Sequence, residues 1–381
     1  MSESPDFVTL PDLACRSLGS GVPYANDELF AERENLIKPE PAVFSTEDFG
    51  HKGKVYDGWE TRRRREPGHD FAVVRFGAPG IVRGVVIDTA WFKGNYPPFA
   101  SVEATSAEGY PSPAELERAD WQTIVERSPL RGDSENSFPV AAGQRFTHVR
   151  LSIYPDGGVA RFRVHGEVVP DPRLLPDTFD LAAAEHGAQV VDCSDMFYSS
   201  PTNLIMPGRA RIMGDGWENA RRRDDANDFV TFALAGPGTV TMAELDTSHF
   251  VGNAPGWASL RGIDARSASL EESRFWSELL PLTRLQPDTP HRFRLGAHRP
   301  MTHIRMDVFP DGGLARVRLY GSMDPAQRRV ISLRWFNALP ETHARAVIAQ
   351  HADDEHAAKL AASRPFTDAA ALPDAILAVF R

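Results

Sequence analysis

The chain of 381 residues contains one sequence block twice. The string DGWETRRRR at 57–65 returns as DGWENARRR at 215–223, and YPDGG at 154–158 returns as FPDGG at 309–313. The first pair of strings is 158 residues apart and the second pair 155, so the second copy lacks three residues between them. Solenoid repeats have periods of only about 20–50 residues. The pattern therefore predicts a duplicated domain.

The duplication extends upstream of these strings. Asn-Leu-Ile at 35–37 returns at 203–205, so the first copy carries ten more residues before its DGWE string. A chain of this length has room for two or three domains. We expect a first repeat at 1–170, a second repeat at 171–330 and a C-terminal segment at 331–381.

Strand patterns fill each copy. The β-branched runs at 71–76 and 81–88 predict two strands separated by a Gly-Ala-Pro-Gly turn. Over 160–166, arginines alternate with apolar residues, which is the period of a half-buried strand. Many short strands with Gly and Pro turns favour a β-sandwich. The segment 334–381 instead has the apolar spacing of two or three short helices.

Charge and cysteine content narrow the function. A formal net charge of −10 disfavours binding to nucleic acid, which depends on a basic surface. The two cysteines, Cys15 and Cys193, form no CxxC pair, so we expect a cytoplasmic protein without a disulfide framework. The N-terminus has no basic leader before an apolar stretch, and no window approaches the roughly 18 apolar residues of a membrane span. We therefore expect no association with a membrane.

Three features resemble the galactose-binding-like, discoidin-type jelly roll. They are the string Asp57-Gly58-Trp59, the Gly-Pro turn at 77–80 and a closing strand that ends at Gly166. With the strand pattern, this resemblance predicts an all-β fold of two tandem duplicated jelly-roll β-sandwiches plus a short α-helical C-terminal tail. Such a fold carries binding modules as readily as enzymes.

A longer series of motifs resembles the allantoicase family. In chain order the motifs are FAERENLIKP, DGWETRRRR, GHDFAVVRFGAPG, VVIDTAWFKGNYPP and YPDGGVARFRVHG, and the resemblance covers about Asp6 to Gly321. It implies that the chain hydrolyses a small-molecule substrate, allantoate, to ureidoglycolate and urea in purine degradation. No zinc-ligand spacing, phosphate-binding loop or dinucleotide fingerprint occurs, so we expect no metal and no cofactor.

This reaction breaks the bond between the central carbon of allantoate and a urea nitrogen. Urea is a poor leaving group unless it is protonated, so a general acid is needed, and a base helps water to add. Arginine suits the substrate carboxylate because its planar fork donates two hydrogen bonds. The repeated loop supplies both residue types. We expect proton transfer by Glu60 and Glu218, and carboxylate binding by Arg64, Arg65, Arg222 and Arg223. For any one arginine, the alternative is an ion pair with a nearby carboxylate such as Asp70, or with a neighbouring subunit.

A second repeated loop leaves a strand and adds polar residues, and loops on a rigid scaffold carry most binding sites. Amide side chains in this loop can hydrogen-bond ureido groups. We expect substrate contacts from Asp88, Asn95, Asp246 and Asn253. Lys93 is matched by Val251, so the two copies no longer do identical work. This leaves two arrangements open: one composite site, or one active and one decayed site.

Two other functions stay open. One is a urea-releasing hydrolase that acts on ureidoglycolate, whose leaving group is the same. The other is a non-catalytic ligand-binding jelly-roll protein, against which the missing leader and disulfides argue. We also expect a homo-oligomer, because an arginine-rich duplicated sandwich with a helical tail favours self-association.

Overall fold

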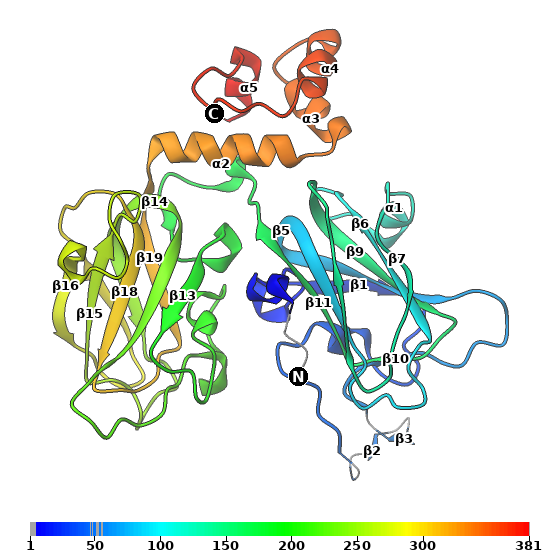
Figure 1. The fold of residues 1–381 in the computed structure, drawn as a ribbon, viewed down its shortest axis with the longest axis horizontal. Coiled ribbons are helices and arrows are strands. Elements are labelled where there is room, and N and C mark those ends of the chain that lie inside the picture. Colours follow the sequence, from blue (N-terminus) through cyan, green and yellow to red (C-terminus); the bar gives the residue numbers. More distant parts are fainter. Residues whose placement is uncertain (1–4, 46, 48, 51–52, 55, 381) are drawn as a thin grey trace. The chain divides into compact units, whose positions relative to one another are not determined.

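The computed structural model describes residues 5–45, 47, 49–50, 53–54 and 56–380 (Figure 1). The chain divides into two compact units. The first unit comprises Met1–Val169, Phe336–Val347 and Asp354–Ala362, and the second comprises Pro170–Trp335, Ile348–Asp353 and Ser363–Arg381. Each unit contains one sequence repeat folded as a β-sandwich, as predicted, and part of the C-terminal helical segment.

The first sandwich is organised around one long strand, β5. Its elements are β1 (Gly21–Ala25), β2 (Phe49–Gly50), β3 (Gly53–Lys54), β4 (Trp59–Glu60), β5 (Asp70–Asp88), β6 (Phe99–Thr105), α1 (Pro113–Glu117), β7 (Gln122–Pro129), β8 (Glu135–Pro139), β9 (Arg145–Tyr154), β10 (Gly158–Val159) and β11 (Arg161–Val168). The main sheet has the order β1-β5-β9-β6-β7, and β8 and β11 also pair with β5. Short 3₁₀ turns at Asp6–Thr9, Arg16–Leu18 and Arg33–Ile37 precede these strands.

Strand β5 belongs to both layers of the sandwich. Its first part pairs with β9 over Asp70–Arg75, and its last part pairs with β11 over Gly80–Asp88. The prediction of two strands separated by a turn was therefore wrong. The Gly-Ala-Pro-Gly string bends one continuous strand, and its glycines let other backbones approach: a Cβ on Gly77 would lie 2.3 Å from the carbonyl oxygen of Leu18.

The second sandwich repeats this plan. Its elements are β12 (Phe179–Asp180), β13 (Gln189–Cys193), β14 (Asp228–Asp246), β15 (Trp257–Ile263), β16 (Ser277–Arg284), β17 (Pro290–Arg294), β18 (Met301–Phe309) and β19 (Arg316–Met323), with 3₁₀ turns at Pro172–Leu174, Ala184–His186, Pro201–Ile205, Met213–Asp215 and Ser273–Phe275. The sheet order is β12-β19-β14-β18-β15-β16, and β13 and β17 also pair with β14. Strand β14 is thus the counterpart of β5.

Strand β11 shows the predicted alternation: Phe162 and Val164 lie in the apolar core, and Arg163 on the other face is only partly buried. Arg161, at the start of the strand, departs from this pattern because it is only 2% exposed. The Arg161 guanidinium donates to the carbonyl oxygen of Glu40 and to Oδ2 of Asp57. The segment that covers Arg161 thus lies about 120 residues earlier in the chain, and no local pattern in β11 reveals it.

Helices α2 (Pro325–Ala338), α3 (Glu341–Ile348), α4 (Asp354–Ala362) and α5 (Asp374–Val379) end the chain, in orange and red in Figure 1. Helical structure therefore begins at Pro325, before the position expected from the sequence, and comprises four helices rather than two or three. Among the described residues, no helix is long and apolar enough to span a membrane.

Candidate active site

The repeated DGWE loop is held by the same contacts in both units. Trp59 is fully buried, and its indole Nε1 donates to the carbonyl oxygen of Asp27 at 2.8 Å. Trp217 makes the matching bond to Asp195, also at 2.8 Å. The two tryptophans are therefore core residues that anchor the loop, as polar-tipped aromatic side chains commonly do.

The repeated Asn-Leu-Ile string has a structural role in the same loop. The side-chain amide of Asn35 donates to the carbonyl oxygen of Gly58 at 2.9 Å, and that of Asn203 donates to Gly216 at 2.9 Å. This bond satisfies a backbone carbonyl immediately before the tryptophan. The string at 35–37 thus positions the DGWE loop.

Asp57 ties the DGWE loop to the segment before it. Its carboxylate accepts from Arg161, from the backbone of Val43 and from Lys38. Burial would raise the pKa of the Asp57 carboxyl, but these hydrogen bonds outweigh that effect and hold the pKa below its ordinary value. Asp57 is therefore an ionised anchor of the loop.

Glu60 is the most deeply buried acid of the loop, at 8% exposure. It lies on β4, opposite Gly158 of β10. Oε1 of Glu60 accepts a hydrogen bond of 2.6 Å from the side-chain amide of Asn95. Oε2 is buried and has no hydrogen-bond partner among the described residues. Burial raises the pKa of the Glu60 carboxyl, and the Asn95 bond opposes this only in part.

Glu218 repeats the bond but not the burial. Its Oε1 accepts from the side-chain amide of Asn253 at 2.6 Å, while Glu218 itself is only half-buried. The Asn253 amide also lies 3.3 Å from the sulfur of Met213. The structure therefore brings each predicted glutamate together with its predicted asparagine, and it distinguishes the two pairs by burial.

Arg64 and Arg222 are already engaged by carboxylates. Arg64 forms an ion pair of 2.7 Å with Asp70, which is 1% exposed, and Arg222 forms one of 2.6 Å with Asp228, which is also 1% exposed. The ion-pair alternative considered for a single arginine thus describes these two residues. A buried carboxylate needs a paired cation. Arg64 and Arg222 therefore stabilise the loop by pairing with the buried Asp70 and Asp228.

The other predicted arginines point to solvent. Arg65 and Arg223 are exposed, and neither has an ion-pair partner within the described ranges. Arg65 lies along a groove of about 450 Å³ in the first unit. The groove is lined by Asn26, Asp27, Arg62, Arg63, Arg64, Arg65, Glu66 and Asp70. Arg62 and Arg64 are paired with Asp27 and Asp70, so Arg63 and Arg65 are the exposed arginines of the groove that can meet a small anion.

Asp88 and Asp246 turn the chain at the ends of β5 and β14. Each accepts a hydrogen bond of 2.8 Å from the backbone two residues ahead, at Ala90 and Ser248. Burial is the largest cause of the raised pKa of Asp88. The structure gives these two residues turn contacts, and within the described part of each unit no hydrogen bond joins Asp88 to Glu60 or Asp246 to Glu218.

Several residues that shape the loop were not predicted as part of the site. Oδ2 of Asp156 accepts from the backbone N–H of Arg64 at 2.9 Å, and Asp311 accepts from Arg222 at 2.7 Å. Asp27 accepts from the backbone of Arg62 at 3.0 Å. The available signal for Asp156 is its repetition as Asp311 in the YPDGG and FPDGG strings.

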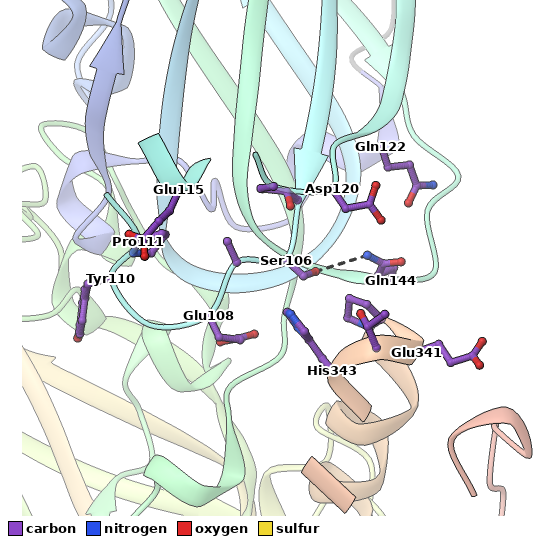
Figure 2. A pocket seen from close by; sticks show the side chains of 15 residues that line it. Ser106, Glu108, Tyr110, Pro111, Glu115, Asp120, Gln122, Gln144, Glu341 and His343 are labelled. Atoms are coloured by element: carbon purple, nitrogen blue, oxygen red, sulfur yellow. Dashed lines mark hydrogen bonds between the residues drawn. The ribbon is translucent and has the colours of Figure 1, made fainter. Parts of the chain in front are cut away.

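A larger cavity of about 660 Å³ lies elsewhere in the first unit (Figure 2). Figure 2 shows Ser106, Gln144 and His343 around it, and none of the predicted site residues lines it. Across the part of the chain that the structure describes, no three His, Cys, Asp or Glu side chains are grouped closely enough to hold a metal ion.

Comparison with known proteins agrees with these repeats. The family profile described as the allantoicase repeat matches residues 11–169 and 179–324. A probable allantoicase from Nocardia farcinica is 56% identical over 321 residues, which cover 83% of this chain and 95% of that protein. A probable allantoicase from Streptomyces coelicolor is 52% identical over 331 residues, covering 83% and 86%. The crystal structure of allantoicase from Saccharomyces cerevisiae matches with a TM-score of 0.71 and 34% identity, covering 82% of this chain and 92% of that chain. These findings confirm the predicted duplicated jelly-roll fold.

Proposed function

The chain belongs to the allantoicase family, hydrolases that convert allantoate to ureidoglycolate and urea, and we propose that it carries out this reaction beside Glu60 and Asn95 of the first repeat. The observation that carries the assignment of the site is the Glu60 carboxyl, which is buried, has a raised pKa and retains one oxygen without a partner. A carboxyl whose pKa is raised by burial keeps its proton to a higher pH than an ordinary glutamate does, and the leaving urea requires a proton donor.

The Asn95 bond determines which oxygen of Glu60 carries the proton. Oε1 already accepts from Asn95, so the acidic proton resides on Oε2. From Oε2 it passes to the departing urea nitrogen as the bond to the central carbon breaks, and the ionised Glu60 then takes a proton from the water that adds. Glu60 thus acts first as general acid and then as general base.

The loop that carries Asn95 gives substrate a way to reach Glu60. Asn95 is exposed although its amide reaches the buried carboxyl, and no atom lies within 4 Å of a Cβ placed on the neighbouring Gly94. The surface beside Asn95 is therefore open to a ligand. When the Asn95 amide exchanges its bond to Glu60 for the ligand, it can bind the carbonyl oxygen of a ureido group.

Arg65, with Arg63, is the proposed partner of the substrate carboxylate. Both are exposed on the groove of about 450 Å³, whereas the guanidinium of Arg64 is taken up by Asp70. Asp27 connects the groove to the DGWE loop, because it accepts from Arg62 and its carbonyl accepts from Trp59. The clamp and the acid are thus built on one continuous loop.

The second repeat carries the proposed decayed counterpart of this site. Glu218 and Asn253 keep their bond, and the pair Arg223 and Arg222 is retained, but Glu218 is only half-buried, whereas Glu60 is buried. We assign to this copy weak or no turnover. Asp88 and Asp246, expected to contact substrate, are proposed only to shape their loops.

Urea release from allantoate tests this proposal. The purified full chain is incubated with allantoate, with ureidoglycolate and with each substrate plus a chelator. Release from allantoate that a chelator does not affect supports metal-free hydrolysis. Release from ureidoglycolate alone indicates the shifted substrate, and no release from folded protein refutes the function.

Three further properties accompany this proposal. The division into 1–170, 171–330 and 331–381 is retained as the repeat organisation, with the last part as a helical appendage. Both cysteines are free thiols, which supports a cytoplasmic location. Self-association into a homo-oligomer and the absence of nucleic-acid binding are tested together by light scattering with and without added DNA.

A further inference from the structure

A second cavity of about 460 Å³ lies on the sheet face of the first unit. The sheet order β5-β9-β6-β7 brings its walls together from residues distant in sequence. The wall residues used below are His69, Phe71, Ser101, Glu126, Arg127 and Tyr154. The cavity shares no lining residue with the arginine groove, although the two adjoin where His69 and Phe71 flank Asp70.

Arg127 is the available cation of this cavity. Its guanidinium lies over the rings of Tyr154 and Phe99, with distances of 4.4 and 5.0 Å to the ring centroids. Such cation–π contacts hold the planar group in place while its N–H edge stays free. Among the described residues, no carboxylate forms an ion pair with Arg127. A fixed guanidinium with free donors suits a ligand carboxylate.

The second arginine of the cavity, Arg150, is already neutralised. Its Nε and one terminal nitrogen lie 2.8 and 2.7 Å from Oε2 of Glu103. It also lies over the ring of Trp121, 4.7 Å from the centroid. Arg150 therefore forms part of the wall and leaves Arg127 as the anion-binding group.

Polar groups surround Arg127 at positions that suit the rest of a small ligand. The hydroxyls of Ser101 and Tyr154 are 2.9 Å apart. The imidazole of His69 lies 4.8 Å from the Tyr154 ring, and burial, followed by the charges of Arg150 and Arg64, lowers the pKa of His69. The His69 ring is therefore neutral at pH 7 and can both donate and accept a hydrogen bond. Glu126 adds an acceptor for N–H groups.

The second repeat lacks this arrangement. Alignment places Leu282 at the position of Arg127, Asn227 at that of His69 and Phe309 at that of Tyr154. Two arginines of that sheet are paired there: Arg261 and Arg305 lie 2.9 and 3.0 Å from the carboxylate of Asp307. At the aligned position, the first copy thus has the Arg127 guanidinium and the second copy has a leucine beside an ion-pair cluster. A role in folding shared by both repeats does not explain this difference.

We propose that the sheet-face cavity of the first repeat is a second binding site, for a small organic carboxylate that also carries amide or ureido N–H groups. Arg127 binds the carboxylate, Glu126 accepts the N–H groups, and His69 with the Ser101 and Tyr154 hydroxyls binds the remaining polar atoms. The Phe71 ring forms the apolar wall. The site binds its ligand without reaction.

Calorimetry with ureidoacetate, which has one carboxylate and one ureido group, tests the proposal. The titration uses the full chain carrying Glu60→Gln, Arg63→Ala and Arg65→Ala, so that the proposed active site neither turns over a substrate nor keeps its carboxylate-binding arginines. We expect binding that weakens at least tenfold with Arg127→Leu, which installs the residue of the second repeat, and several-fold with His69→Asn, also the residue of the second repeat. Arg284→Leu, on an exposed strand position of the second unit, is the matched control and leaves binding unchanged.

A neutral probe separates charge recognition from shape. Ureidoacetamide should bind the parent protein at least tenfold more weakly than ureidoacetate does. In the Arg127→Leu variant, the two compounds should bind with equal affinity. Absence of ureidoacetate binding at millimolar concentration, or equal affinity in Arg127→Leu, overturns the proposal. Loss of urea release in Arg127→Leu as complete as in Glu60→Gln also overturns it, since the cavity is then part of the reaction site. Retained turnover in Glu60→Gln would instead refute the proposed active site and leave the binding result standing.

Discussion

The amide of Asn95 donates a 2.6 Å hydrogen bond to Oε1 of Glu60, whose Oε2 is buried without a partner among the described residues. The equivalent bond from Asn253 to Glu218 has the same length but a more open surrounding. The same DGWE string therefore places its glutamate in a buried position in the first repeat and in a half-buried position in the second.

Substitution of the two glutamates should therefore have unequal effects. Glu60→Gln keeps the size of the side chain but removes the transferable proton, so kcat for urea release should fall by roughly 10²–10⁴, the usual contribution of general acid–base catalysis. Glu218→Gln should lower kcat for urea release by less than about tenfold, which is smaller than the loss expected for Glu60→Gln. Equal losses in the two variants would favour a composite or symmetric site.

The raised pKa of Glu60 should appear in two pH profiles. If the protonated acid is the active form, kcat falls as pH rises through this raised value. The folded state also binds the Glu60 proton more tightly than the unfolded state, so this carboxyl stabilises the fold below its ordinary pKa of 4.5, and that stability is lost as pH rises through the raised value. Glu60→Gln should flatten both the pH profile of kcat and the pH profile of the unfolding free energy. Urea-release kinetics measure the first profile, and denaturant titrations at each pH measure the second.

Neighbouring arginines should separate into structural and binding roles. Arg64→Ala leaves the carboxylate of Asp70 buried with only the Asn26 amide as partner, and unfolding free energy should fall by roughly 2–4 kcal/mol. Arg65→Ala should leave stability within about 0.5 kcal/mol and raise KM for allantoate. Denaturant unfolding and urea-release kinetics on both variants check this. If Arg64→Ala keeps the stability of the parent protein but raises KM for allantoate, then Arg64 binds the substrate and its assignment as a structural residue is wrong.

The duplication made much of the site visible in the sequence. Repetition located the DGWE loop, and the glutamate and asparagine that it predicted do meet in both units. The sequence did not say which copy buries its glutamate, because burial depends on packing of other segments around each loop. The sequence also did not decide whether Arg64 pairs with the substrate carboxylate or with Asp70, because an arginine can form an ion pair with either carboxylate.

Other features depend on contacts between distant segments. Arg161 looks like a solvent-facing residue of an alternating strand, and its burial follows from contact with Glu40, far away in sequence. The Gly-Ala-Pro-Gly string has the composition of a turn, yet the pairing of β5 with β9 and β11 makes it a bend. The cavity around Arg127 becomes recognisable only once the order of four strands is known.

His148 should make the fold sensitive to acid. Burial, aided by the charge of Arg75, lowers the pKa of His148 from 6.5 to about 4. The unfolded chain therefore binds this proton more readily, so stability is full above pH 6.5 and falls by about 3 kcal/mol as pH drops through the folded value. His148→Gln should reduce the slope of unfolding free energy between pH 6.5 and 4. His351→Gln, at an exposed position, is the control and should leave the slope unchanged.

Gly158 links the stability of the first repeat to its proposed chemistry. It lies opposite Glu60 on the paired strand, its N–H donates to the carbonyl oxygen of Asn95 at 2.8 Å, and a Cβ here would lie 2.0 Å from the ring of Phe92. Gly158→Ala must therefore displace that ring or the strand, with a loss of about 1–3 kcal/mol of unfolding free energy and a lower kcat.

The second repeat provides the matched comparison. A Cβ on Gly313 would lie 1.9 Å from the ring of Phe250, so Gly313→Ala should destabilise the fold by a similar amount while leaving kcat nearly intact. Gly143→Ala, where no atom lies within 4 Å of the added Cβ, should change neither quantity by much. Thermal unfolding and urea-release kinetics on the three variants separate the loss of packing from the loss of catalysis. If Gly313→Ala lowers kcat as much as Gly158→Ala does, the second repeat takes part in the reaction, and the assignment of a single active copy is wrong.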